Sequence, residues 1–309
     1  QRGATAGHRR LVRRSRHDMS VRELTADLVV DAHATLGEGA RWDPQGRLYW
    51  VDIMAPALHV YDPSTDIDNV VPVDRYLGAV VLRHSSGLLS AVHEGFAALD
   101  PTTGAVDLLA TVQASDSGLR MNDGNCDPQG RFWAGSMALD ERPGAGALYR
   151  LDTDGSVVRM LTDVTISNGI VWSLDGTTTY YIDTPTRRVD AFSFEPDSGT
   201  LRDRRPFVSL PPGPGSPDGM TIDADGCLWV ALYGGSAVHR YTPDGQLDTV
   251  VHVPATATTC CAFGGDDLDV LYITTAAKGV PPGAQEPHAG GLFAVDPSVT
   301  GVPGTPYAG

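Results

Sequence analysis

The stretch DPQGRLYWVD at residues 43–52 is a polar turn followed by a run of alternating apolar and aromatic side chains. This pattern is typical of a hairpin turn that leads into a β-strand. It occurs six times, as DPQGRLYWVD (43–52), HSSGLLSAVH (84–93), DPQGRFWAGS (127–136), SLDGTTTYYID (173–183), DADGCLWVAL (223–232) and DDLDVLYITT (266–275). The turn positions are Gly46, Gly87, Gly130, Gly176, Gly226 and Asp269, with separations of 41, 43, 46, 50 and 43 residues. A unit of nearly constant length is therefore repeated six times.

Each unit is followed by a second one, an apolar strand that ends in a turn containing Asp or Pro. Its copies are LHVYDPSTD (58–66), FAALDPTTG (96–104), LYRLDTDGS (148–156), VDAFSFEPDSG (189–199), VHRYTPDGQ (238–246) and LFAVDPSVTG (292–301). A repeat of about 45 residues holds four short strands, which is one propeller blade. We therefore predict an all-β fold, a six-bladed β-propeller built from a single domain at residues 19–309. Few residues follow Gly301, so the N-terminal strand at Leu28–Leu36 is expected to close the last blade.

Composition excludes several functional classes. Glycine (35) and proline (22) are abundant among the 309 residues, which favours turns over long helices. The formal net charge of −15 repels nucleic-acid backbones and anionic membrane surfaces, so we expect neither as a partner. No apolar run reaches the length of a membrane-spanning helix. The four cysteines form no CxxC pair, which indicates reduced thiols and a cytoplasmic protein.

The first 18 residues differ from the rest. They carry six arginines and no apolar segment of the kind found in a signal peptide. We expect residues 1–18 to be a disordered basic tail or a cloning remnant.

A shared spacing indicates where the functional site lies. The residues eight positions before the turns at Gly46, Gly130, Gly176 and Gly226 all carry side-chain oxygen, and they are Glu38, Asn122, Asn168 and Asp218. In the other two blades this position holds Ala79 and Cys261. Equivalent positions of different blades converge on the propeller axis, so the four polar side chains are expected to meet there. The alternative is that the NG, DG and NDG sequences are only turn signals.

Two carboxylates and amide oxygens form a hard donor set, and buried carboxylates need a counter-charge. We therefore expect one divalent cation, Ca²⁺, Mg²⁺ or Mn²⁺ in preference to a site built for Zn²⁺. Arg120 lies two residues before Asn122, on the same face of an extended strand. Its five donors suit a polyhydroxylated or carboxylated substrate. The alternative is a structural ion pair with an acid.

Several motifs together resemble the SMP-30/gluconolactonase/luciferin-regenerating-enzyme family over residues 21–302. They are LGEGARWD (36–43), RMNDGNCDPQGRFWAGSM (120–137), ISNGIVWSLDG (166–176), YYIDT (180–184), PDGMTIDADGCLWVALYGG (217–235) and TTCCAFGG (258–265). The resemblance implies a six-bladed propeller with one catalytic divalent metal, and lactonase activity toward sugar lactones.

The resemblance also implies roles for single residues. It places Glu38, Asn168 and Asp218 on the metal and makes Asp218 the general base. It places Arg120 and Asn122 on the substrate, and Asp140 matches an acidic residue that touches substrate in relatives.

The sequence thus predicts metal-dependent hydrolysis of aldonolactones, with Ca²⁺ as the first choice of metal and Mg²⁺, Mn²⁺ or Zn²⁺ as alternatives. Two other functions stay open. One is a related hydrolase of phosphotriesters or other esters, which an apolar channel wall would favour. The other is a binding propeller without enzymatic activity, in which the metal is only structural.

Overall fold

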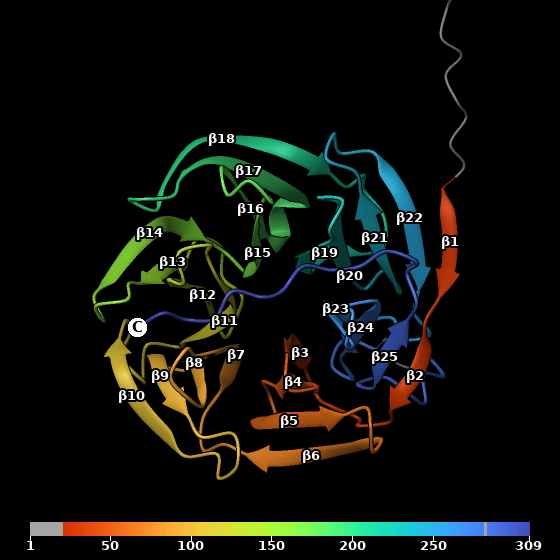
Figure 1. Cartoon of the computed structure of the whole chain (residues 1–309), viewed down its shortest axis with the longest axis horizontal. Coiled ribbons are helices and arrows are strands. Elements are labelled where there is room, and N and C mark those ends of the chain that lie inside the picture. The colour runs from red at the N-terminus through yellow and green to blue at the C-terminus, as the bar shows by residue number, and fades with distance from the viewer. Residues whose placement is uncertain (1–20, 281–282) are drawn as a thin grey trace, which may run out of the picture.

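The structure is a computed structural model that describes residues 21–280 and 283–309. The tail predicted at residues 1–18 lies outside these residues. Six β-sheets are arranged as blades around a central channel (Figure 1), which confirms the predicted six-bladed β-propeller. The described residues form strands and turns, with one short 3₁₀ helix at Thr184–Thr186. No helix among them is long and apolar enough to cross a membrane.

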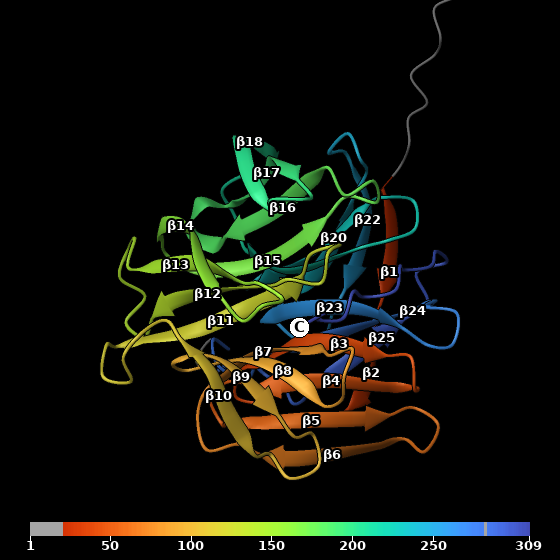
Figure 2. The same cartoon turned by 60° about the vertical axis from the view of Figure 1, so that its left-hand side comes forward.

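Each blade has four strands that follow one another outward from the channel; Figure 2 shows this for β3 to β6. The innermost strands are β3 (Gly37–Asp43), β7 (Leu77–Leu82), β11 (Leu119–Cys126), β15 (Ser167–Trp172), β19 (Ser216–Ile222) and β23 (Thr258–Gly264). The second strands are β4 (Arg47–Asp52), β8 (Leu88–Val92), β12 (Phe132–Ala138), β16 (Thr178–Asp183), β20 (Leu228–Tyr233) and β24 (Val270–Thr275). The third strands are β5 (Ala57–Asp62), β9 (Gly95–Leu99), β13 (Gly146–Leu151), β17 (Arg188–Glu195), β21 (Ala237–Tyr241) and β25 (Leu292–Val295). The outer strands are β6 (Ile67–Pro72), β10 (Val106–Thr111), β14 (Val157–Val164), β18 (Thr200–Ser209), β22 (Leu247–His252) and β2 (Asp27–Val30).

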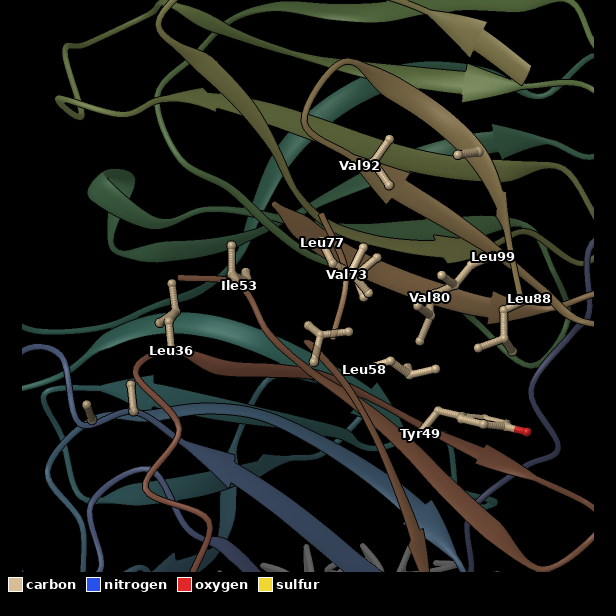
Figure 3. Packing of buried hydrophobic residues seen from close by; sticks show 14 residues of the cluster. Leu36, Tyr49, Ile53, Leu58, Val73, Leu77, Val80, Leu88, Val92 and Leu99 are labelled. Carbon is tan, nitrogen blue, oxygen red and sulfur yellow. The ribbon is translucent and has the colours of Figure 1, made fainter. Parts of the chain in front are cut away.

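Burial explains the amino-acid patterns of these strands. The second strands lie between two neighbours inside a blade and read as almost continuous apolar runs, such as LWVALY in β20. The outer strands are largely exposed and polar, as TLRDRRPFVS in β18 shows. Apolar clusters fill the space between adjacent blades, and Figure 3 shows the one between β4–β5 and β7–β9. Leu58, Leu77 and Val92 are completely buried there.

The N-terminal strand closes the ring, as predicted. β2 pairs antiparallel with β25 and is the outer strand of the last blade. It ends at Val30 rather than at Leu36, so the predicted strand is too long by six residues. An additional strand, β1 (Arg22–Thr25), pairs parallel with β22 of the preceding blade. The N-terminal segment therefore joins two neighbouring blades.

The aspartates of the DPQG turn at 127–130 and of the DADG turn at 223–226 stabilise their own blades. Asp127 is fully buried and accepts hydrogen bonds from the backbone N–H of Arg131 (3.0 Å) and from Nε1 of Trp133 (2.9 Å). Asp223 accepts from Nε1 of Trp229 at 2.9 Å in the same way. These carboxylates fix a turn to the buried tryptophan of the next strand, which is a structural role.

The C-terminal segment crosses one end of the channel (Figure 1), and we call residues 300–308 the C-terminal strap. The carbonyl of Thr300 accepts a hydrogen bond from the backbone of Ala224 at 2.9 Å. Tyr307 pairs with the backbone of Leu82 and His84, and the N–H of Ala308 donates to Gly130. The strap thereby connects blades on opposite sides of the ring.

Candidate active site

The six innermost strands share a local irregularity. Each shifts register against its second strand, as a β-bulge does. Asn122, Asn168 and Asp218 lie inside such shifts, and Glu38 is the last paired residue before one. Because a bulge re-aims side chains, these four residues can turn from the sheet toward the channel.

Glycines next to the bulges allow neighbouring strands to approach. A Cβ on Gly169 would lie 2.8 Å from the backbone nitrogen of Met220. A Cβ on Gly219 would lie 2.8 Å from the Cα of Cys260. The innermost strands are thus too close at the axis for a larger side chain, as the Asn-Gly and Asp-Gly sequences suggest.

The structure brings the four oxygen-bearing residues together at one cavity of about 300 Å³. This size is at the lower end of the range for small-molecule sites. The cavity is lined by Leu36, Glu38, Arg120, Asn122, Met137, Glu141, Ile166, Asn168, Thr184, Pro185, Ser216, Asp218, Tyr233 and Lys278. Ala79 and Cys261 do not line it. The bulge of β23 falls at Thr259, so the spacing from Asp269 places Cys261 two residues too far along the strand.

A chain of hydrogen bonds along the wall of the cavity joins three blades. Nη1 of Arg120 donates to Oδ1 of Asn122 at 2.6 Å, and Nδ2 of Asn122 donates to Oδ1 of Asn168 at 3.0 Å. Nδ2 of Asn168 then donates to Oγ1 of Thr184 at 2.7 Å, and this hydroxyl donates to the carbonyl of Pro217 at 2.9 Å. Each amide is therefore oriented by its neighbours, and Oδ1 of Asn168 keeps a lone pair for a further partner.

The carboxyl groups at the axis are buried with few partners. Glu38 and Asp218 are 4% and 5% exposed. Oε2 of Glu38 accepts one hydrogen bond, from the backbone N–H of Gly39 at 3.0 Å. Oδ1 of Asp218 is buried and accepts none. An ionised oxygen in this position costs several kcal/mol unless a cation or proton accompanies it.

A third buried acid, Asp123, adds to this charge. It follows Asn122 in the bulge of β11, is 6% exposed, and accepts a hydrogen bond from Gly124 at 2.7 Å. Burial, and then the charge of Asp123, raises the pKa of Glu38 to about 8. The pKa of Asp218 is also raised, by burial first and then by the charges of Glu38 and Asp123. The sequence analysis missed Asp123, although the NDG motif contains it.

These acids fit a divalent cation. No three His, Cys, Asp or Glu side chains gather as a metal-ligand group within residues 21–280 and 283–309. The available donors are instead the carboxylates of Glu38 and Asp218 together with the amide oxygen of Asn168. This all-oxygen set suits a hard cation. The partnerless Oδ1 of Asp218 and the raised pKa values are what a missing counter-charge would leave.

Arg120 lines the same cavity. Within residues 21–280 and 283–309 it forms no ion pair with an acid, unlike the structural ion pair considered as the alternative. Nη1 donates to Asn122 and to the carbonyl of Met121 at 3.0 Å. The side chain is 4% exposed, and burial lowers the pKa of its guanidinium to about 10. A buried guanidinium with a cavity in front of it can donate to a ligand.

The structure does not bring Asp140 to the cavity. Its side chain is 64% exposed and pairs with Arg142 at 2.9 Å. The next residue, Glu141, lines the cavity, and its carboxylate lies 3.8 Å from Nζ of Lys278. Glu141 has a left-handed backbone (φ 56°), which turns successive side chains in different directions. The sequence analysis therefore missed Glu141 by one residue, and it also missed Tyr233 and Lys278.

Comparisons with known proteins extend over nearly the whole chain. Residues 36–277 match the family model of the SMP-30/gluconolactonase/LRE-like region. Regucalcin of Xenopus laevis is 38% identical over 293 residues, covering 92% of this chain and 98% of the relative. Pentonolactonase XacC of Haloferax volcanii is 37% identical over 290 residues, covering 91% and 97%. The solved structure of a calcium-binding protein, regucalcin from Agrobacterium tumefaciens, has a TM-score of 0.88 at 30% identity and covers 93% of this chain and 99% of that one.

Proposed function

The chain belongs to the SMP-30/gluconolactonase/LRE-like family, and we propose that it is a divalent-metal-dependent lactonase that opens sugar lactones. One observation carries the proposal. Glu38, Asn168 and Asp218 line a small cavity together with Arg120 and Asn122, so the proposed metal donors and substrate donors share one site. The 37% identity with a pentonolactonase supports the reaction class.

Glu38, Asn168 and Asp218 would hold the cation, and we propose Ca²⁺ as the first choice, with Mg²⁺, Mn²⁺ or Zn²⁺ as alternatives. A cation bound there would supply Lewis acidity toward the lactone carbonyl and offset the buried negative charge. The calcium-binding relative supports the choice of Ca²⁺.

The side chains around these donors can perform the remaining tasks. Asp218 accepts no hydrogen bond at Oδ1, so this atom can take a proton from the attacking water. Arg120 and Asn122 are held by the hydrogen-bond chain, and we assign them to the ring oxygens and hydroxyls of the lactone. Glu141, which lines the cavity, takes the place expected for Asp140 as an acceptor for sugar hydroxyls.

The lining of the cavity favours lactones over the two alternatives. Seven of its fourteen lining residues carry a charged or amide group, whereas an esterase for apolar phosphotriesters needs a predominantly apolar wall. A purely structural metal gives no reason for a buried arginine that faces the cavity without an ion pair. We further propose a cytoplasmic location, which the four free and buried cysteines support.

A panel of lactones, phosphotriesters and simple esters tests the proposal. The protein is stripped of metal, supplied with Ca²⁺, Mg²⁺, Mn²⁺ or Zn²⁺ in turn, and assayed on each substrate. We expect aldonolactone hydrolysis only with added metal. Hydrolysis of the phosphotriesters alone, or no hydrolysis with any metal, would refute the lactonase assignment.

Two isosteric variants separate the roles of the carboxylates. Asp218→Asn keeps one oxygen donor but removes the base, so kcat should fall by about 10²-fold even at saturating metal. Glu38→Gln removes only a ligand charge, so excess metal should restore most of its activity. Asp107→Asn, on the exposed face of β10, is the charge-matched control. If excess metal restores both variants equally, Asp218 is a ligand and not the base.

A further inference from the structure

Lys278 is the only lysine among the 23 Lys and Arg residues of the chain. It lies in the loop after β24 and lines the cavity described above. In a chain that uses arginine everywhere else, the single ammonium group therefore stands at the mouth of the candidate active site.

The backbone of Lys278 is fixed from two sides. Its N–H donates to the carbonyl of Thr35 at 2.9 Å, next to the first blade. Its carbonyl accepts a hydrogen bond from the hydroxyl of Tyr233 on β20 at 3.0 Å. Gly279 follows with φ of 91°, and a Cβ there would lie 2.1 Å from the Tyr233 hydroxyl. Two hydrogen bonds therefore fix the backbone of this loop residue, one to the turn before β3 and one to the last residue of β20.

The ammonium group itself is only loosely engaged. Among residues 21–280 and 283–309 it forms one ion pair, with Glu141 at a distance of 3.8 Å, and the two side chains are 45% and 53% exposed. Ion pairs between such exposed groups contribute little, about 0–1 kcal/mol. A lysine has three N–H donors, so donors stay available for a ligand in the cavity.

The two cations of the cavity lie at different depths. Arg120 is buried beside the metal donors, and Lys278 is half exposed at the rim. A lactone whose carbonyl faces Glu38, Asp218 and Arg120 would direct its far end toward Lys278. In a protein with a net charge of −15, this lysine offsets the repulsion that an anionic substrate would meet.

We propose that Lys278 recognises a carboxylate at the far end of the substrate, so that the preferred substrates are lactones of sugar diacids. This inference rests on the proposed lactonase function and names the substrate class of the same site. We assign Lys278 to specificity alone, because its side chain is half exposed at the rim, whereas the donors proposed for ring opening are buried.

A carboxylate fits this position better than a phosphate. Phosphate sites that use a lysine usually add an arginine fork or several backbone N–H groups to it. Lys278 offers a single ammonium, and the neighbouring Glu141 carboxylate would repel a dianion more strongly than a monoanion.

Three substrates test the proposal by kinetics: D-glucaro-1,4-lactone, neutral D-glucono-1,5-lactone and 6-phospho-D-glucono-1,5-lactone. Lys278→Met should lower kcat/KM for the glucarolactone by about tenfold, the value of one charge-assisted hydrogen bond, and change the neutral lactone by less than about twofold. Lys278→Arg should retain most of the preference. Arg159→Met, on the exposed face of β14, removes the same charge far from the cavity and serves as the matched control.

The outcomes separate the possible roles. If Lys278→Met lowers kcat/KM equally for all three substrates, the specificity role is refuted. The same equal loss in Glu141→Gln would show that the Lys278–Glu141 ion pair only holds the two loops together. A loss confined to the phospholactone would also overturn the proposal and make phosphate the recognised group.

A second measurement does not depend on catalysis. Because Lys278 is the only lysine, an amine-acetylating reagent modifies this residue and the N-terminal amine, and peptide mass spectrometry distinguishes the two. D-glucarate at saturating concentration should slow acetylation of Lys278 several-fold, whereas D-gluconate at equal ionic strength should not. Equal protection by both acids, or none by either, refutes the proposal. If the enzyme opens no lactone yet glucarate protects, the lactonase assignment fails and carboxylate recognition stands.

Discussion

Replacing Glu38 with Gln is expected to stabilise the metal-free protein while weakening metal binding. The reason is that Glu38 is 4% exposed and its pKa is raised from 4.5 to about 8 by burial and by the charge of Asp123. Folding therefore favours the protonated form, and each increase in pH above 4.5 costs stability until the pH passes about 8. Gln has the same shape and no charge, and its carbonyl oxygen can still accept the hydrogen bond from Gly39.

The magnitude follows from the pKa shift. One pKa unit corresponds to about 1.4 kcal/mol, so the full shift of Glu38 at pH 8 corresponds to roughly 4 kcal/mol. Asp218 and Asp123 share the repulsion, which reduces the gain from a single substitution to about 2–4 kcal/mol. For a chain of this length, that change raises Tm by about 4–8 °C. At pH 4.5 and below, the gain should be close to zero.

The assay is thermal unfolding of wild type and Glu38→Gln after metal removal, at several pH values from 4.5 to 9. The difference in Tm between the two proteins should grow with pH, because only the wild type ionises Glu38. The titration of all other groups is common to both proteins and cancels in the difference. Adding Ca²⁺ should then raise Tm of the wild type more than that of the variant. A difference in Tm that stays constant from pH 4.5 to 9, or a less stable metal-free variant at pH 8, would show that Glu38 is not strained by its buried charge.

The other predictions concern metal binding, substrate contacts and the strap. Metal affinity should rise with pH up to about 8, with proton release in calorimetry, because Glu38 must lose its proton to bind a cation. Arg120→Ala should lower kcat/KM but leave metal content and Tm nearly unchanged; loss of metal would indicate a structural role instead. Glu141→Gln should lower kcat/KM for aldonolactones more than Asp140→Asn does, since only Glu141 lines the cavity. Tyr307→Ala should lower the free energy of unfolding by about 3 kcal/mol in denaturant titrations, because Tyr307 is 3% exposed and ties the strap to the ring.

The fold could be predicted because its repeat is visible at every level of the sequence. Each turn position is followed by an apolar strand, and each of the six copies can bury its apolar face only against its neighbours. The strand that closes the ring was also predictable, because too few residues follow Gly301 to complete the last blade. The parallel addition of β1 to β22 carries no such signal, since a four-residue exposed strand has little pattern of its own.

The deep part of the site followed from the same repeat. Glu38, Asn122, Asn168 and Asp218 occupy matching positions, and the structure brings all four to one cavity. The residues at the rim of the cavity could not be predicted from the repeat, because the rim is formed by loops whose lengths differ from blade to blade. With its left-handed backbone, Glu141 lines the cavity and the adjacent Asp140 does not.

This division indicates how chemistry and specificity are separated in the molecule. The proposed metal donors stand at the bulges of innermost strands, where the glycines at 169 and 219 leave little room for change. The rim residues Glu141 and Lys278 stand on loops, and their side chains are about half exposed. A substitution at the bulges should therefore affect whether any lactone is opened, whereas a substitution at Lys278 should affect only which lactone is preferred. A charge reversal at Lys278 that abolished hydrolysis of neutral and acidic lactones alike would contradict this separation.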